Sequence, residues 1–182
     1  MRIEAVPALP DHWVEPAWCF YWETFDELRI HAVQRHLLHR DEFDEMMADK
    51  RFGKWVAFDS GGAVVGLSVM TDDLTALPLL SQDYFVHRWP RMYAERRIFY
   101  IVFAGAQRGV RGTGVFIRLL REMMEPLSAV DGMGMVDVCS HNEVMRDLPV
   151  AIGRILGRID GRMRMRRLDS QSYWLYEFPA VS

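Results

Sequence analysis

Residues 97–124 constrain the fold of this chain more than any other stretch. They begin with β-branched and aromatic residues from Ile98 to Ala104, a composition typical of a buried strand. A glycine-rich segment from Gly109 to Gly114 follows, and apolar residues then recur at helical spacing, at Phe116, Leu119, Leu120 and Met123. The first N–H groups of a helix lack partners inside the helix, and the helix dipole adds positive charge there. The stretch therefore predicts a site for a phosphate or pyrophosphate.

The glycine segment does not match two common nucleotide-binding motifs. A dinucleotide fingerprint counted from Gly112 requires a glycine at position 117, which is Ile117. A P-loop requires a lysine after the last glycine, where Val115 stands. The pattern that remains is G-x-x-G-x-G. Its alternative interpretation is a strand-to-helix turn without a ligand.

Length, charge and cysteine content narrow the class of protein. A chain of 182 residues predicts one domain over residues 1–182. The net charge of −3 argues against a nucleic-acid partner held by overall charge. Cys19 and Cys139 are too few for a disulfide framework and fit a reducing cytoplasm. Neither a signal peptide nor a membrane-spanning run of about 18 apolar residues is expected. We therefore expect a cytoplasmic protein without a membrane or nucleic-acid partner.

The order of predicted elements indicates an α/β (α+β) fold. Before the central stretch we expect two strands joined by a hairpin turn at Ser60–Gly62, and a long packed loop over 72–96. Strands are predicted at residues 2–6, 54–59, 63–71, 98–104, 133–140, 162–166 and 173–178. A helix is predicted over 17–38, with a break near 30–31, and a short helix follows with Asp41 as its N-cap. A third helix is predicted after the glycine segment, and a last helix ends at Gly157.

This order, together with Arg111-Gly112-Thr113-Gly114, resembles the GNAT superfamily of N-acyltransferases. The acyl-CoA loop of that family is written Q/R-x-x-G-x-G/A, and Gly109 stands where the family has Gln or Arg. The resemblance covers nearly the whole chain. It implies a mixed, mostly antiparallel central sheet flanked by helices and splayed between strands 4 and 5.

The resemblance also implies acetyl-CoA or another acyl-CoA as co-substrate. Pantetheine would lie along the backbone of the fourth strand at Val102, Phe103 and Ala104, and Asn142, after the fifth strand, would orient pantetheine or water. The pyrophosphate would meet the amides of Gly109, Val110, Arg111, Gly112, Thr113 and Gly114. Glycine suits this role because it lets the backbone approach a ligand closely.

The catalytic side chains that the family commonly carries are not in register here. A Glu early in the fourth strand would fall at Ile98, and a Tyr on the last helix would fall at Gly153. Replacement candidates for proton transfer are Tyr100, Glu95, His87 and His141. The alternative interpretation is that the tyrosine ring packs in the core and that the histidines are structural.

Several further residues are candidates for the acceptor site. Asp72 and Asp73 end the third strand and could bind an ammonium group, or they could cap a turn. Trp22 and Trp89 suggest a partly apolar acceptor, although core packing explains them equally well. His31, His36 and His39 lack a further ligand and are expected on a solvated helix face, so no metal site is predicted.

The function predicted from these features is an acyl-CoA-dependent N-acyltransferase that acts on a small amine by direct transfer. Acetyl-CoA is the expected donor, and a homodimer is one assembly to consider. The alternative is a GNAT-like domain that binds an acyl-CoA or an acyl carrier without turnover, because the usual Glu and Tyr are missing. A structural domain without a ligand is the third interpretation.

Overall fold

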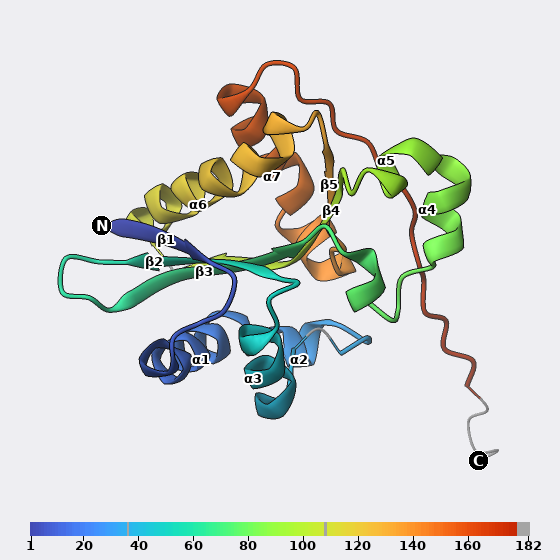
Figure 1. The fold of residues 1–182 in the computed structure, drawn as a ribbon. Coiled ribbons are helices and arrows are strands. Elements are labelled where there is room, and N and C mark those ends of the chain that lie inside the picture. The colour runs from blue at the N-terminus through green and yellow to red at the C-terminus, as the bar shows by residue number, and fades with distance from the viewer. Residues whose placement is uncertain (36, 108, 178–182) are drawn as a thin grey trace, which may run out of the picture.

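The protein is built on a five-stranded sheet between two layers of helices (Figure 1). The computed structural model describes residues 1–35, 37–107 and 109–177, with the backbone alone for 110–113. The strands are β1 (Arg2–Val6), β2 (Gly53–Phe58), β3 (Val64–Thr71), β4 (Ile98–Ala106) and β5 (Met133–Met135), in that spatial order. All neighbours are antiparallel except β4 and β5, which are parallel. The predicted fold class, a mixed and mostly antiparallel sheet flanked by helices, is confirmed.

The helices cover both faces of the sheet. One face carries α1 (Asp11–Phe25), α2 (Leu28–His31) and α3 (Arg40–Ala48), and the other carries α6 (Val110–Ala129) and α7 (Leu148–Ile159) (Figure 1). No helix in the described ranges is long and apolar enough to cross a membrane.

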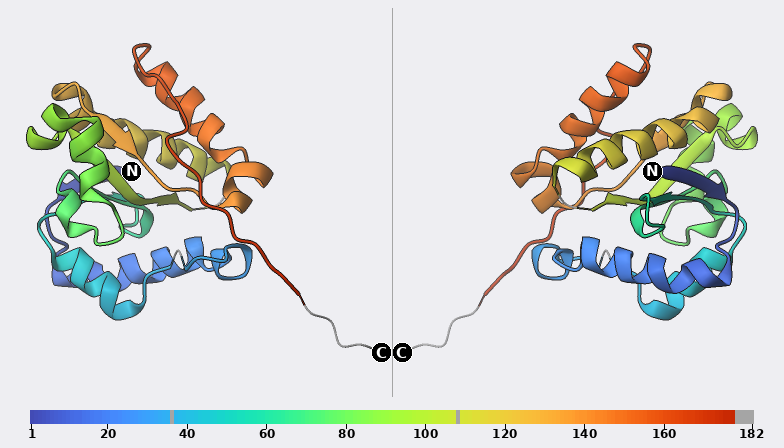
Figure 2. Two further views of the ribbon diagram at one scale, coloured as in Figure 1. Left: turned by 90° about the vertical axis from the view of Figure 1, so that its right-hand side faces the viewer. Right: turned by 90° about the vertical axis from the view of Figure 1, so that its left-hand side faces the viewer.

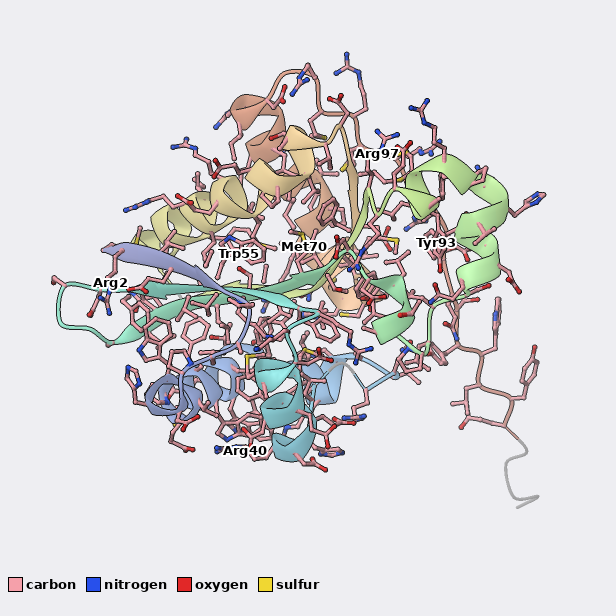
Figure 3. The ribbon with its side chains drawn as sticks, in the orientation of Figure 1. Arg2, Arg40, Trp55, Met70, Tyr93 and Arg97 are labelled. Carbon is pink, nitrogen blue, oxygen red and sulfur yellow. The ribbon has the colours of Figure 1, made fainter. Side chains whose placement is uncertain are left out.

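The core has two halves because neighbouring strand residues point to opposite faces. Val56 belongs to the cluster beneath α1 and α3, whereas Ala57 belongs to the cluster beneath α6. Trp55 and Met70 lie on the α6 side of the sheet (Figure 3). A side chain at Gly66 would meet Leu119 at 2.6 Å, so this glycine lets α6 approach β3 closely. The continuous apolar run of β3 follows from burial on both faces.

The packed loop expected over residues 72–96 is wrong in part, since the segment folds into three short helices. They are η1 (Leu74–Ala76), α4 (Gln82–Arg88) and α5 (Pro90–Ala94). Ser81 caps α4 by accepting a hydrogen bond from the Tyr84 amide at 3.3 Å, and Pro90 occupies the first position of α5. Phe85 packs with Leu74 and Ile98 in a third cluster.

The N-terminal helices begin and end at residues other than predicted. The expected 17–38 helix begins at Asp11 and ends at Phe25, and α2 follows after a break earlier than the predicted one. The N-cap of α3 is His39 rather than Asp41. The carboxylate of Glu42 accepts the His39 amide hydrogen at 2.7 Å, which completes a capping box.

Most of the glycine segment is helical, so the segment does not form a loop from Gly109 to Gly114. Gly109 is the N-cap, with φ 101°, and α6 begins at Val110. The positive φ favours glycine at that position because other residues rarely adopt it. The expected loop over Gly109–Gly114 is therefore wrong in extent, although a helix N-terminus does lie in this segment.

The C-terminal third differs most from expectation. The strand predicted to Ser140 ends at Met135, and η2 (His141–Met145), a π-helical turn, follows. The last helix, α7, runs past Gly157 to Ile159. Residues 160–177 contain no strand in the structure, so the strands predicted at 162–166 and 173–178 are wrong over their described residues, while Phe178 lies outside them.

Two side-chain contacts explain why the first of these segments does not pair with β5. The Arg166 guanidinium lies 5.5 Å from the ring centroid of Trp89, and Arg167 forms an ion pair with Glu143. Both contacts hold the segment against neighbouring elements instead of against the sheet edge.

Lys54 is a charged side chain buried within the sheet. It is fully buried, and its Nζ donates to the carbonyl oxygens of Pro7 at 2.8 Å and Asp49 at 2.5 Å. Burial lowers the pKa of Lys54 to about 8, although the nearby Asp49 carboxylate opposes this shift.

The Lys54 pKa predicts a specific dependence of stability on pH. Between pH 8 and 10.5 the folded chain has lost the proton that the unfolded chain still binds, so the free energy of unfolding rises with pH. We expect this rise to be roughly 1–3 kcal/mol relative to Lys54→Met, measured by urea unfolding of both proteins. An equal pH dependence in the two proteins would contradict the prediction.

Candidate active site

The candidate site lies where β4 and β5 part. The two strands pair only over Ile98–Tyr100 and Met133–Met135, and β4 then continues to Ala106 without a strand partner on that side among the described residues. Val69 pairs with Phe103 and Met70 with Ile101, which leaves Val102 as an extra residue in β4. This β-bulge bends β4 at the point where the strands separate. The splay expected between strands 4 and 5 is present.

The far end of β4 leads directly into the N-terminus of α6. The Gln107 amide donates to the carbonyl of Val65 at 2.9 Å and holds the end of the strand against β3. Gly114 is exposed, and a side chain built there would meet nothing within 4 Å. Gly105 differs, because a side chain there would meet Phe25 at 2.7 Å. Gly105 is thus a packing glycine, whereas Gly114 leaves room for a ligand.

The candidate donor-binding residues follow this path. Val102, Phe103 and Ala104 are half-buried on β4, and the ring of Phe103 packs on Tyr21 and Phe25 of α1. The backbone of Val110, Arg111, Gly112 and Thr113 forms the first turn of α6, and their side chains lie outside the described part of the structure.

Tyr100 contacts a residue that the sequence analysis missed. Its phenol donates a hydrogen bond to the carboxylate of Asp137, so the contact bridges β4 and the segment after β5. Burial, reinforced by this carboxylate, raises the pKa of Tyr100 well above its usual range. The phenol therefore stays protonated and anchors Asp137, which is itself exposed. The only hint of this contact in the sequence is that Asp137 is an acidic residue within the strand predicted over 133–140.

His141 and Asn142 form a second polar group in η2. His141 Nε2 and Asn142 Oδ1 are buried and have no hydrogen-bond partner in the described structure. Buried polar atoms without partners are uncommon, which marks these two as candidates for contact with a ligand. The His141 ring stacks on His31 of α2, with centroids 4.1 Å apart and planes 4° apart.

The other histidines have different surroundings. The solvated helix position predicted for His31 is confirmed, since His31 is exposed on α2, and its ring also stacks on His141. His39 caps α3, and His36 lies outside the described residues. His87 is exposed on α4.

Glu95 lies away from the parted strands. It follows α5 and precedes β4, so it is near the end of β4 opposite Gly109. Its carboxylate pairs with Arg91 at 2.8 Å and Arg97 at 2.7 Å, and the hydrogen bond from Arg91 lowers its pKa. Both arginines thus engage the Glu95 carboxylate, which the sequence suggested as a candidate for proton transfer.

Asp72 and Asp73 lie at a small cavity beside α5. Asp72 accepts a hydrogen bond from Arg96 at 2.7 Å. Asp73 caps η1 by accepting from the Thr75 amide at 3.1 Å, so the capping alternative is confirmed for this residue. The cavity has a volume of about 170 Å³ and is lined by Asp72, Asp73, Leu74, Thr75, Tyr93, Arg96 and Ile98, with Tyr93 reaching it from α5 (Figure 3).

Trp22 and Trp89 belong to separate aromatic groups. Trp22 is exposed on α1 and lies 5.6 Å from Trp18 between ring centroids, whereas Trp89 lies 6.3 Å from Phe85. The two tryptophans proposed to line an acceptor pocket therefore pack with different elements.

Comparison with known proteins identifies the fold. No protein-family model and no curated protein sequence matches the chain. Among solved structures, a probable acetyltransferase superposes with a TM-score of 0.54 at 13% identity, covering 100% of this chain and 99% of the other. The chain has a GNAT-like fold.

Two aminoglycoside acetyltransferases share this GNAT-like fold. One, from an uncultured soil metagenomic sample and in complex with sisomicin, superposes with a TM-score of 0.54 at 11% identity, covering 95% of both chains. The other, an aminoglycoside antibiotic 6'-N-acetyltransferase from Acinetobacter baumannii, has a TM-score of 0.51 at 8% identity, covering 98% of this chain and 100% of its own. At these identities the likeness concerns the fold.

The contact between Tyr100 and Asp137 can be tested by titrating the phenols. Asp137→Asn removes the negative charge that disfavours the phenolate, so we expect the pKa of Tyr100 to fall towards its usual value. Because burial, the larger cause of the raised pKa, persists in the variant, an ultraviolet titration should show Tyr100 ionising at a lower pH than in the wild type without reaching the usual range, and Tyr100→Phe should abolish the difference. Identical titrations of wild type and Asp137→Asn would contradict the contact.

Proposed function

We propose that the protein is an acyl-CoA-dependent N-acyltransferase, with acetyl-CoA as donor and a small amine as acceptor. One observation carries the proposal: β4 parts from β5 at the Val102 bulge and then leads to a glycine-capped helix N-terminus. The GNAT-like fold supports acetyl transfer at the level of the fold.

The donor would be bound mainly by backbone groups. On the side away from β3, β4 has no strand partner at Val102–Ala104 among the residues that the structure describes, and pantetheine amides could add there. The pyrophosphate would lie at the first amides of α6, where the helix dipole favours an anion. Gly114 leaves space beside those amides.

Transfer requires a neutral amine and therefore a group that removes its proton. Asp137 fits this role because its exposed carboxylate is fixed by Tyr100 at the point where the strands part. The amine nitrogen would attack the thioester carbonyl carbon, forming a C–N bond. Before this attack, Asp137 would take one proton from the ammonium group, directly or through water. The C–S bond would then break, the thiolate would take a proton from solvent, and the acylated nitrogen would lose its second proton to solvent.

Binding without turnover is the second candidate function, and two positions favour it. Ile98 is buried, and Gly153 lies against Met165, whose Sδ would be 2.9 Å from an added side chain. Neither position supplies an acid or a base. Release of free CoA from acetyl-CoA over a panel of amines separates the two functions, since the binding domain releases none.

The pyrophosphate assignment can be tested at Gly114. We expect Gly114→Glu to weaken CoA binding at least about tenfold, because it adds bulk and negative charge beside the α6 amides. The melting temperature should hold, because the added side chain meets nothing within 4 Å. Isothermal titration with CoA measures the affinity.

Gly161→Glu is the matched control. It introduces the same charge at a glycine with equally open surroundings, beyond the C-terminus of α7. Its CoA affinity should equal that of the wild type. A folded Gly114→Glu protein with unchanged affinity would remove the support for the proposed donor site.

The role of Asp137 can be tested by kinetics. We expect Asp137→Asn to lower kcat about 10²-fold or more with little change in CoA affinity, because it removes the proton acceptor but keeps the shape. Asp83→Asn, an exposed carboxylate on α4, serves as control and should retain full activity. Equal kcat in all three proteins would show that another group takes the proton.

A further inference from the structure

The turn that follows β5 is joined to the opposite helix layer by two side-chain contacts. Arg146, directly after η2, pairs with Glu27 at the start of α2, and Nη2 lies 2.5 Å from Oε1. At the other end of both turns, the His141 ring stacks on the His31 ring with centroids 4.1 Å apart. In Figure 1 and Figure 2 the orange turn η2 lies above the light-blue α2. The two turns therefore face each other along their full length.

The spacing of the four residues explains why both contacts form together. Glu27 and His31 are four residues apart, so they lie on one side of a helical turn. His141 and Arg146 are five residues apart, which is the repeat of the π-helical turn that η2 forms. In an α-helix the same five residues would rotate Arg146 about 140° away from His141. The π-helical turn thus presents both side chains to α2.

The corner that leads into α2 rests on the free half of β4. Phe25, the last residue of α1, packs its ring on Phe103 with centroids 5.6 Å apart, and a side chain at Gly105 would meet Phe25 at 2.7 Å. Phe103 and Gly105 belong to the part of β4 that has lost its parallel partner. Residues 25–31 therefore contact β4 on one side of the opening and η2 on the other. This corner fixes the distance between the two sides.

The η2 turn carries polar atoms that are available to a ligand. His141 Nε2 and Asn142 Oδ1 are buried and have no hydrogen-bond partner in the described part of the chain. π-helical turns occur frequently at functional sites. Side chains of a binding site keep their geometry only where a supporting set of contacts holds them. Glu27 and His31 supply such contacts to η2 from the α2 side.

We propose that Glu27 and His31 are positioning residues for the acyl donor. They hold η2 at a fixed distance from β4, so that His141 and Asn142 meet the pantetheine arm across the opening. The amide groups of pantetheine offer N–H donors and C=O acceptors, which match an asparagine carbonyl oxygen and an imidazole nitrogen. Glu27 and His31 act through η2 and need no contact with the donor. The inference rests on the donor site of the proposed function.

Charge reversal tests the ion pair between α2 and η2. Glu27→Arg and Arg146→Glu should each lower the affinity for CoA at least about tenfold in isothermal titration, because each places like charges together and displaces η2. The double variant restores the pair with opposite polarity and should recover most of the affinity. ADP carries the pyrophosphate without pantetheine, so its affinity should stay within about twofold of the wild type in all three proteins.

Two substitutions at His31 test the stacked rings. His31→Phe keeps a ring against His141 and should keep the CoA affinity, whereas His31→Ser should lower it about three- to tenfold. Arg29→Glu is the matched control, because it reverses a charge on α2 whose ion pair, 2.6 Å from Asp26, stays within the same corner. This control should leave the affinities for CoA and ADP unchanged.

Each outcome separates this inference from the proposed function. Wild-type CoA affinity in both single charge variants overturns the inference and leaves the donor site standing. A double variant as weak as the single variants overturns it too, because the ion pair then has no positioning role. Equal losses of CoA and ADP affinity would also overturn it, since they would reflect damage to the whole fold. A wild-type protein that binds neither CoA nor ADP overturns the proposed donor site, and the inference with it.

Discussion

The separation of β4 from β5 is the constraint on which the rest of the structure depends. β4 keeps its antiparallel partner β3 along nearly its whole length, yet it loses its parallel partner after Tyr100. The bulge at Val102 supplies the bend, and the close approach of α6 at Gly66 fixes the helix that follows. One strand thereby serves as the centre of the core at one end and offers free backbone groups at the other.

The parts of the fold that sequence predicts well are those buried on both faces. β2, β3 and β4 lie within two residues of their predicted ends because apolar runs bounded by glycine and turn residues leave few alternatives. Segment 72–96 was harder to predict, since its three short helices are stabilised by the Ser81 cap, by Pro90 at the first position of α5 and by one buried cluster rather than by a long periodic face. Residues 162–166 and 173–177 have a strand composition but form no strand in the described structure, because composition alone does not determine whether a sheet edge is available to them.

Some features of the candidate site could likewise be predicted from the sequence, and others could not. The glycine-capped N-terminus of α6 was predictable, because the positive φ at Gly109 is a local backbone requirement that glycine meets. The side-chain contacts around the parting strands could not be predicted, because Tyr100 contacts Asp137 and His31 contacts His141 across long separations in sequence. Glu95 shows the converse error. Glu95 is close to β4 in sequence, but it pairs with Arg91 and Arg97 at the end of β4 opposite the candidate site.

Lys54 has a consequence for the order in which the molecule assembles. Its ammonium group is bonded to carbonyls of Pro7 and Asp49, and the contact with Pro7 spans 47 residues. Until both carbonyls are in place, closing the sheet over this side chain would remove the charge from water without replacing its hydrogen bonds, which is costly. The corner after β1 and the corner before β2 must therefore dock together. A single lysine thus couples the corner after the first strand to the corner between α3 and β2.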